Sequence, residues 1–212
     1  MPETIRLVIA DDHPIVRQGL HRIVDDHADM MVVAEAADGD EVMRVLEHSK
    51  TDVLLLDISM PGPPFLDLLG RLRTDWPGVA VLVLSAHAEE QYAVRALRAG
   101  AAGYLNKERS PDELADAIRR IHRGGRYITP TLAEHLAISL DATGGGPPHE
   151  KLSDREFRVL CSLGAGRSIK EIAASLSLSP KTVSTYRGRL LKKLGLDTTA
   201  DLIRYAVEHG LC

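Results

Sequence analysis

The 212-residue sequence has few cysteines, few aromatic residues and no long apolar run. Its two cysteines, Cys161 and Cys212, lack metal-ligand spacing and are too few for a disulfide scaffold, so we expect reduced thiols. Apolar runs such as residues 53–56 and 79–84 fall far short of the ~18 residues that suggest a membrane span. The first residues lack the basic and then apolar stretch of a signal peptide. We therefore expect a cytoplasmic protein without membrane contact.

The formal net charge of −4 conceals opposite charges in the two parts of the chain. Residues 1–150 carry 15 Lys and Arg against 24 Asp and Glu, whereas residues 151–212 carry 11 against 6. The basic residues of the second part gather between Pro180 and Leu194, a stretch without an acidic residue. A solvated helix face usually mixes both signs, so this excess favours a polyanion as partner.

Residues 141–148 contain three glycines and two prolines and cannot hold a helix or a central strand. They indicate a linker between two domains. We place the first domain at residues 1–128, a linker helix and Gly/Pro-rich linker at 129–150, and the second domain at 151–212. The linker helix is expected to end near Leu140.

In the first domain, short apolar runs alternate with segments of helical periodicity. The runs are nearly continuous, which is typical of parallel strands that are buried on both faces. Five strand–helix repeats predict an α/β fold with a doubly wound parallel sheet. The expected strands cover residues 6–10, 31–34, 52–56, 79–84 and 102–105.

After the linker the sequence shows only helical periodicity, which predicts an all-α domain. Two serine-to-glutamate capping boxes, Ser153–Glu156 and Ser168–Glu171, and the pair Ser179–Pro180 mark helix starts. The short turn at 177–179 between the second and third helices suits a helix-turn-helix. The four expected helices cover about 154–163, 169–176, 180–194 and 198–209.

Polar residues follow four of the five expected strands. Asp11 and Asp12 follow the first strand, Asp57 and Ser85 directly follow the third and fourth, and Lys107 comes shortly after the fifth. Because parallel strands end at one edge of a sheet, we expect these side chains to converge there. Three carboxylates repel one another unless a cation is present, and oxygen ligands favour Mg²⁺. An ammonium and a hydroxyl group opposite them suit a phosphoryl group.

Each of these residues also has a simpler interpretation. A single Asp at a strand end more often starts a turn or caps a helix, so only the combination indicates a site. His13 could be a metal ligand, but an oxygen-rich site for a hard ion does not call for imidazole. Tyr104, taken alone, would only cover the edge of the sheet.

The first domain resembles the receiver domain of two-component response regulators. The resemblance implies a flavodoxin-like fold and implies that Asp57 accepts a phosphoryl group from a histidine kinase. The matching segments are Ala10-Asp11-Asp12-His13-Pro14, Leu56-Asp57-Ile58-Ser59-Met60-Pro61-Gly62, Leu84-Ser85-Ala86 and Tyr104-Leu105-Asn106-Lys107.

The resemblance also implies roles for the residues around the phosphoacceptor. Phosphoryl oxygens would contact Ser85 and Lys107, and Tyr104 would be a switch that turns inward when Ser85 moves toward the phosphate. Mg²⁺ offsets the charge repulsion as the anion approaches the carboxylate. The implied Mg²⁺ ligands are Asp11, Asp12, Asp57 and the backbone carbonyl of Ser59.

The chain departs from the receiver pattern at Phe65. The family usually has a glycine there, at the start of the third helix, and glycine is often used where φ is positive. Phenylalanine tolerates a positive φ poorly. We therefore expect an altered loop beside Asp57, which could change kinase docking or the lifetime of the phosphate.

Residues 178–194 form a candidate recognition helix, since an α-helix fits the major groove of DNA. Residues 152–209 as a whole resemble the LuxR-type helix-turn-helix of the NarL/FixJ class. The segments that carry this resemblance are Leu152-Ser153-Asp154-Arg155-Glu156, Ile169-Lys170-Glu171-Ile172-Ala173, Ser179-Pro180-Lys181-Thr182-Val183 and Leu191-Lys192-Lys193-Leu194-Gly195.

The resemblance assigns DNA-contacting positions on this helix. Basic side chains would supply the phosphate contacts that give much of the affinity. Gly188 is unusual, because it weakens a helix and offers no side chain; it could allow close backbone approach or leave one base unread. The expected DNA-contacting residues are Lys181, Thr182, Ser184, Thr185, Arg187, Gly188, Arg189, Lys192 and Lys193.

The last helix carries Leu202, Ile203, Ala206 and Val207, which could be core residues or part of a face that pairs two copies on DNA. Both interpretations stay open at this stage.

Together these features predict a DNA-binding transcriptional response regulator. A partner histidine kinase would phosphorylate it, Mg²⁺ would be its cofactor, and the active homodimer would bind double-stranded DNA. The alternative is a DNA-binding regulator whose first domain is a phosphorylation-independent dimerisation module. We do not expect an enzyme, because a phosphatase of the haloacid-dehalogenase kind needs a second Asp where this chain has Ser59. A dinucleotide-binding protein would need a G-x-G-x-x-G after the first strand.

Overall fold

The computed structural model of the protein describes residues 4–85, 90–107, 110–129, 132–133, 148–176 and 178–211. The chain divides into two compact units, Met1–Leu136 and Ala137–Cys212. The predicted linker helix and the Gly/Pro-rich stretch fall almost entirely outside the described residues. Among the described helices, none is long and apolar enough to cross a membrane.

The first unit is built on a five-stranded parallel sheet with the strand order β2-β1-β3-β4-β5. This confirms the predicted doubly wound α/β fold. The strands are β1 (Ile5–Ala10), β2 (Met30–Ala36), β3 (Val53–Asp57), β4 (Ala80–Ser85) and β5 (Gly103–Asn106). The helices are α1 (Pro14–Asp25), α2 (Gly39–His48), α3 (Phe65–Asp75), α4 (Glu90–Ala99) and α5 (Pro111–His122).

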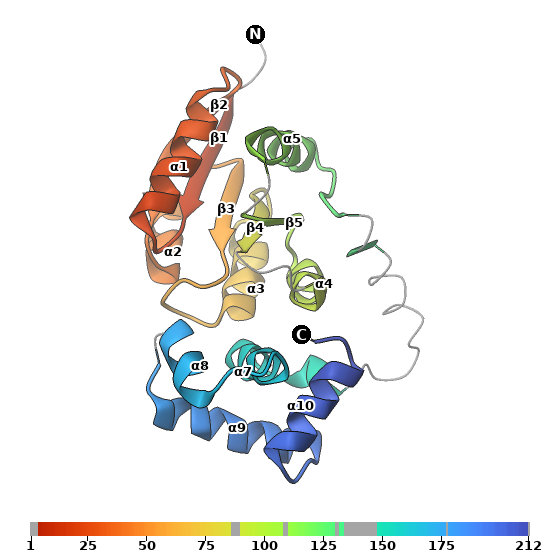
Figure 1. Cartoon of the computed structure of the whole chain (residues 1–212). Helices are drawn as coiled ribbons and strands as arrows, with labels where there is room; N and C mark the ends of the chain where they lie inside the picture. Colours follow the sequence, from red (N-terminus) through yellow and green to blue (C-terminus); the bar gives the residue numbers. More distant parts are fainter. Residues whose placement is uncertain are drawn as a thin grey trace. The chain divides into compact units, whose positions relative to one another are not determined.

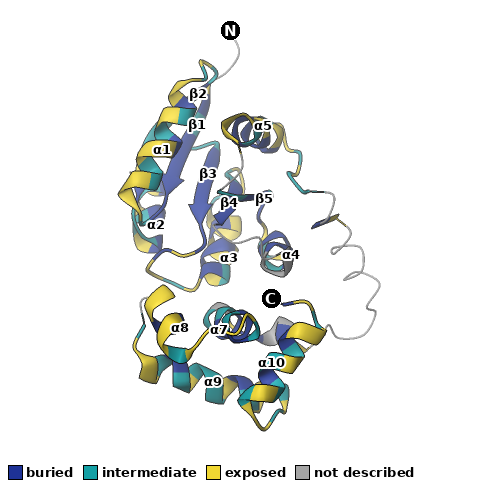
Figure 2. Cartoon of the chain, in the orientation of Figure 1, coloured by how far each residue is buried: buried dark blue, intermediate teal, exposed yellow. Residues whose placement is uncertain are grey.

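Helices cover both faces of this sheet (Figure 1). Apolar residues of α1 and α5 pack with the strands in one core cluster on one face. On the other face α3 lies between α2 and α4. The strands are therefore buried on both sides, and Figure 2 shows them in the colour of buried residues. Val53 to Leu56 of β3 are fully buried, which accounts for their continuous apolar sequence.

The loop that follows β3 is fixed against the start of α2. The Gly39 backbone N–H donates to the Pro61 carbonyl at 2.9 Å, and Asp38 caps α2 by accepting from the Glu41 N–H. Gly62 turns the loop with a φ of +116°. A Cβ atom on Gly39 would lie 2.9 Å from Pro63 Cδ, so the close approach requires a glycine. This packing holds the chain on the C-terminal side of Asp57.

A short segment after α5 joins the outer side of β5. The Tyr127 N–H donates to the Ala102 carbonyl at 3.0 Å, and the Tyr104 N–H donates to the Tyr127 carbonyl at 3.3 Å. The Tyr127 hydroxyl donates to Glu113 Oε1 of α5 at 2.6 Å. The segment is thereby tied to both the sheet and a helix.

The second unit is helical, as predicted. Its elements are a 3₁₀ turn at Pro148–Lys151 and the helices α7 (Asp154–Gly164), α8 (Ile169–Ser175), α9 (Pro180–Leu194) and α10 (Thr199–Glu208). Ser153, Ser168 and Ser179 cap α7, α8 and α9 with their hydroxyl groups. Gly195 ends α9 in the left-handed conformation, with a φ of +67°. The sequence signals for helix starts therefore act as expected.

We predict that Gly39→Ala destabilises the first unit, although alanine is normally the better helix residue. The new methyl group would press on Pro63, and such overpacking typically costs about 1–3 kcal/mol of unfolding free energy. Urea titration followed by circular dichroism measures this. Gly70→Ala in α3 is the matched control, because its Cβ would meet no atom of the described residues within 4 Å, and it should stabilise by up to about 1 kcal/mol. Equal effects of the two substitutions would contradict the prediction.

Candidate functional site

The strand ends of the first unit bring the predicted residues to one edge of the sheet. Asp11 directly follows β1, Asp57 and Ser85 are the last residues of β3 and β4, and Lys107 directly follows β5. The Lys107 backbone N–H donates to the Ser85 carbonyl at 2.7 Å, which joins two of these ends. Asp11, Asp57 and Ser85 are all buried. The convergence follows from the parallel strand directions.

Lys107 connects two of the carboxylates. Its Nζ donates to Asp11 Oδ2 at 2.5 Å and lies 2.8 Å from Asp57 Oδ1. The Asp11 and Asp57 side chains are only 1% and 3% exposed. Two negative charges are therefore held close together inside the protein by one positive charge.

Burial and charge shift the ionisation of this group in opposite directions. Burial raises the pKa of the Asp57 carboxyl, the hydrogen bond and charge of Lys107 offset this only in part, and the charge of Asp11 raises it further. Burial alone would lower the pKa of Lys107, but its hydrogen bonds and charge interactions with Asp11 and Asp57 raise it overall. Lys107 is therefore a firmly charged partner of both carboxylates.

Backbone N–H groups donate to the other oxygen atom of each of these two carboxylates, the one that Lys107 does not contact. The Ser59 N–H donates to Asp57 Oδ2 at 3.1 Å, and the His13 N–H donates to Asp11 Oδ1 at 2.8 Å. Arg17 Nη1 donates to the Asp11 carbonyl at 2.5 Å, so α1 also holds this strand end. Arg17 was not among the residues that the sequence singled out.

The acidic group has the character of a hard-cation site. Asp12 Oδ1 is buried and has no hydrogen-bond partner among the described residues, although His13 Nδ1 lies 2.7 Å away. Ligand atoms of Asp11, Asp12 and His13 lie within 4.8 Å of one another. A buried carboxylate oxygen without a hydrogen bond is an available cation ligand, so these residues fit Mg²⁺. The imidazole of His13 lies beside the acidic pair, and its exclusion from the metal ligands stays a prediction.

Tyr104 and Phe65 lie in the core near this edge. Tyr104 in β5 is buried, with 7% of its surface exposed. Phe65 is the first residue of α3 and is also buried. The left-handed residue of this loop is Gly62, so Phe65 does not bear the positive φ that the family pattern suggested. Its effect on kinase docking and phosphate lifetime stays a prediction.

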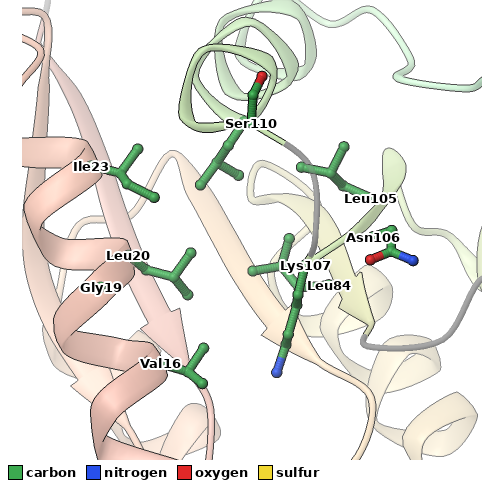
Figure 3. A pocket seen from close by; sticks show the side chains of 10 residues that line it. Val16, Gly19, Leu20, Ile23, Leu84, Leu105, Asn106, Lys107 and Ser110 are labelled. Atoms are coloured by element: carbon green, nitrogen blue, oxygen red, sulfur yellow. The ribbon is translucent and has the colours of Figure 1, made fainter.

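An apolar pocket of about 210 Å³ lies beside the charged group. Figure 3 shows Val16, Leu20 and Ile23 of α1 on one side, opposite Leu105 and Lys107. The pocket also has polar groups in its lining, from Asn106 and Ser110. Of the charged group, Lys107 lines this pocket, which lies between α1 and the start of α5.

In the second unit, α9 buries an apolar face and exposes a basic one. Val183 and Leu190 are fully buried. The exposed residues on α9 include four of the five predicted phosphate-contacting side chains, while Arg187 is half-buried. These four are Lys181, Arg189, Lys192 and Lys193. The arrangement fits a helix that packs on its own unit and offers positive charge to a polyanion.

Lys193 has an internal partner that the sequence did not indicate. Its Nζ donates to Glu156 Oε2 at 2.7 Å. This hydrogen bond connects α9 with the first turn of α7. Glu156 also accepts from the Ser153 N–H at 2.9 Å and is 2% exposed. Burial alone would raise the pKa of Glu156, but the Lys193 and Ser153 hydrogen bonds outweigh it and lower the pKa. Lys193 therefore ties α9 to α7, whatever else it contacts.

The last helix serves partly as core. Leu202 and Ala206 of α10 are fully buried, whereas Val207 is 58% exposed. The core interpretation therefore holds for Leu202 and Ala206, and pairing of two copies through the exposed Val207 stays a prediction.

Comparison with known proteins gives matches to both units. Residues 7–119 match the response regulator receiver domain, and residues 150–206 match the luxR family of bacterial regulatory proteins. Response regulator UvrY of Escherichia coli K12 is 35% identical, over 98% of this chain and 96% of that protein.

Two solved structures of RcsB resemble the chain over nearly its whole length. RcsB from Salmonella enterica serovar Typhimurium, bound to promoter rprA with the phosphomimetic BeF3−, is 26% identical. The match covers 96% of this chain and 98% of that chain, with a TM-score of 0.62. A structure of two RcsB dimers bound to two parallel DNAs is 25% identical over 97% and 98% of the two chains, with a TM-score of 0.60.

We predict that Glu156→Gln destabilises the second unit by about 1–2 kcal/mol at pH 7, because it removes a charged hydrogen-bond acceptor. The folded-state pKa of Glu156 lies below its ordinary value of 4.5. Its ionised form therefore contributes stability above that value, and the contribution is lost as the pH falls through the lowered pKa. Denaturant titrations between pH 7 and pH 3 should show the two proteins converging at low pH.

Glu171→Gln is the matched control for this prediction. Glu171 forms the same capping box at α8 but is exposed. Its replacement by glutamine should therefore lower the free energy of unfolding by less than Glu156→Gln does. The role of the buried ion pair would be refuted if Glu156→Gln lowered the free energy of unfolding by no more than Glu171→Gln. It would also be refuted if the stability difference between Glu156→Gln and the wild type did not change with pH.

Proposed function

This chain belongs to the NarL/FixJ family of response regulators, which join a receiver domain to a LuxR-type DNA-binding domain, and we propose that phosphorylation of Asp57 controls its binding to DNA. The single observation that carries this proposal is the contact of Lys107 with both Asp11 and Asp57. That contact places a buried carboxylate beside a fixed positive charge and a second carboxylate.

Asp57 acts as the nucleophile in the proposed phosphotransfer. Its carboxylate oxygen attacks the phosphorus of a phosphorylated histidine on a partner kinase, forming an O–P bond as the P–N bond breaks. The histidine nitrogen keeps the bonding electrons and takes up a proton. The Ser59 N–H orients the carboxylate, while Lys107 and Ser85 receive the phosphoryl oxygens.

Asp11, Asp12, Asp57 and the Ser59 carbonyl would hold Mg²⁺ in this scheme. When bound, the ion supplies positive charge that offsets the repulsion between carboxylate and phosphoryl group. Phosphorylation replaces one carboxylate charge at Lys107 with a larger negative charge. Ser85 then moves toward the phosphate and Tyr104, which is already buried in this structure, is held inward, which shifts a pre-existing equilibrium toward the active form.

The kinase is proposed to dock at the start of α1. Ile15 is 85% exposed there, two residues after His13 at the acidic edge. The apolar pocket between α1 and α5 begins at the next residue, Val16. Apolar surface beside a reacting group is typical of a site that receives another protein.

The active form is proposed to bind double-stranded DNA in the cytoplasm as a homodimer. The DNA-bound and dimeric states named for RcsB support this, as do the exposed lysines and arginine of α9. Val207 of α10 offers an exposed apolar side chain for pairing two copies. Two copies would then place their α9 helices on a two-fold-related site.

We predict that the wild-type protein gains about 80 Da in mass when incubated with acetyl phosphate and Mg²⁺. Asp57→Asn should not gain this mass, because an amide is not a competent acceptor. Intact-protein mass spectrometry measures both. Asp67→Asn, at an exposed carboxylate of α3, is the matched control and should behave as wild type. Absence of the gain in the wild type would refute the phosphoacceptor role.

We also predict that acetyl phosphate raises the affinity for DNA by about tenfold or more, within the usual range of coupling between two sites. Fluorescence anisotropy with a labelled duplex, selected from a random pool by the phosphorylated protein, provides the measurement. Asp57→Asn should give the low affinity with and without the donor. Equal wild-type affinities in both conditions would favour the alternative, a receiver that only dimerises.

A further inference from the structure

Gly188 lies in the interior of α9, where glycine is a poor choice. Apart from proline, glycine is the least favourable residue inside a helix. A Cβ atom built on Gly188 meets no described atom within 4 Å. Its φ is also not in the left-handed region. Within the part of the chain that the structure describes, neither packing nor backbone conformation requires a glycine here.

The neighbouring residue on the same helix face has its polar group turned inward. Residues three apart are neighbours on a helix surface, so Thr185 lies next to Gly188. The exposed Thr185 donates its hydroxyl to the Lys181 carbonyl at 3.0 Å. This bond engages the hydroxyl with the helix itself and leaves the methyl group as the outward apolar part of the side chain.

Long basic side chains lie on either side of these two residues. Lys181 and Lys192 are both exposed and stand seven residues before and four residues after Gly188. A rise of 1.5 Å per residue separates them by about 16 Å along the helix. The face therefore has charge at both ends and very little side chain in the middle.

We propose that α9 reads DNA by close approach, with the Gly188 backbone against the floor of the major groove and the Thr185 methyl against the methyl group of a thymine. A threonine methyl is one of the apolar groups that recognise thymine in this groove. Lys181 and Lys192 hold the phosphates that flank the contact. This inference rests on the proposed function and names the base that α9 selects.

The test starts from a duplex that the phosphorylated, full-length wild-type protein selects from a random pool. Gly188→Ala should bind this duplex about tenfold more weakly, because the methyl group prevents the approach. The same substitution should raise the melting temperature of the second unit by about 4 °C, because alanine favours the helix. Gly70→Ala in α3, which is equally unhindered, should leave the affinity unchanged.

Two substitutions at Thr185 separate its methyl group from its hydroxyl. Thr185→Val keeps a methyl group and should bind as wild type, whereas Thr185→Ser keeps the hydroxyl and should bind about tenfold more weakly. Replacing each thymine of the duplex in turn by deoxyuridine removes only the methyl group. Replacement at one position in each half-site should weaken binding of the wild-type protein. The same replacement should not weaken the binding of Thr185→Ser any further.

The possible outcomes distinguish this inference from the function on which it rests. Wild-type affinity of Gly188→Ala, or no deoxyuridine position that couples to Thr185, overturns the close-approach contact while DNA binding stands. Loss of binding in Thr185→Val but not in Thr185→Ser also overturns it, because the hydroxyl would then be the reading group. A wild-type protein that selects no sequence overturns the proposed function itself.

Discussion

Two buried carboxylates that share one ammonium group are the constraint on which the first unit depends. Without Lys107, Asp11 and Asp57 would be two buried like charges without a compensating positive charge, which is costly. Each of the three residues comes from a different strand end, so the sheet must keep its register for the charges to balance. The balance is also what makes the group responsive, because any added cation or anion changes the interactions of all three side chains at once.

The second unit solves a similar problem in a permanent way. Glu156 is as buried as Asp57 and likewise has a single lysine partner, Lys193. The Glu156 carboxylate, however, also accepts from both the backbone and the hydroxyl group of Ser153, and its pKa is lowered. Burial instead raises the pKa of Asp57. The Glu156–Lys193 pair fixes α9 on α7, whereas Asp57 lies beside a lysine charge for which a ligand can compete.

The sequence predicts features that depend on local signals and on strand direction. Continuous apolar runs predict β3, serine caps predict α7 and α9, and parallel strands bring Asp57 and Lys107 together because all end at one edge. The Lys193–Glu156 pair and the close packing of Gly39 on Pro63 depend on how separate elements meet in space. No pattern within either segment specifies those contacts, and the turn at Gly62 likewise became clear only from the backbone geometry.

The segment that carries Tyr127 has a consequence for how copies of this protein can associate. An uncovered outermost strand invites pairing with a strand of another molecule, which leads to aggregation. Tyr127 already takes the outward hydrogen bonds of the Ala102 carbonyl and the Tyr104 N–H, so the start of β5 is closed to such pairing at these two groups. A second molecule therefore cannot lengthen the sheet by pairing with Ala102 and Tyr104 at these positions.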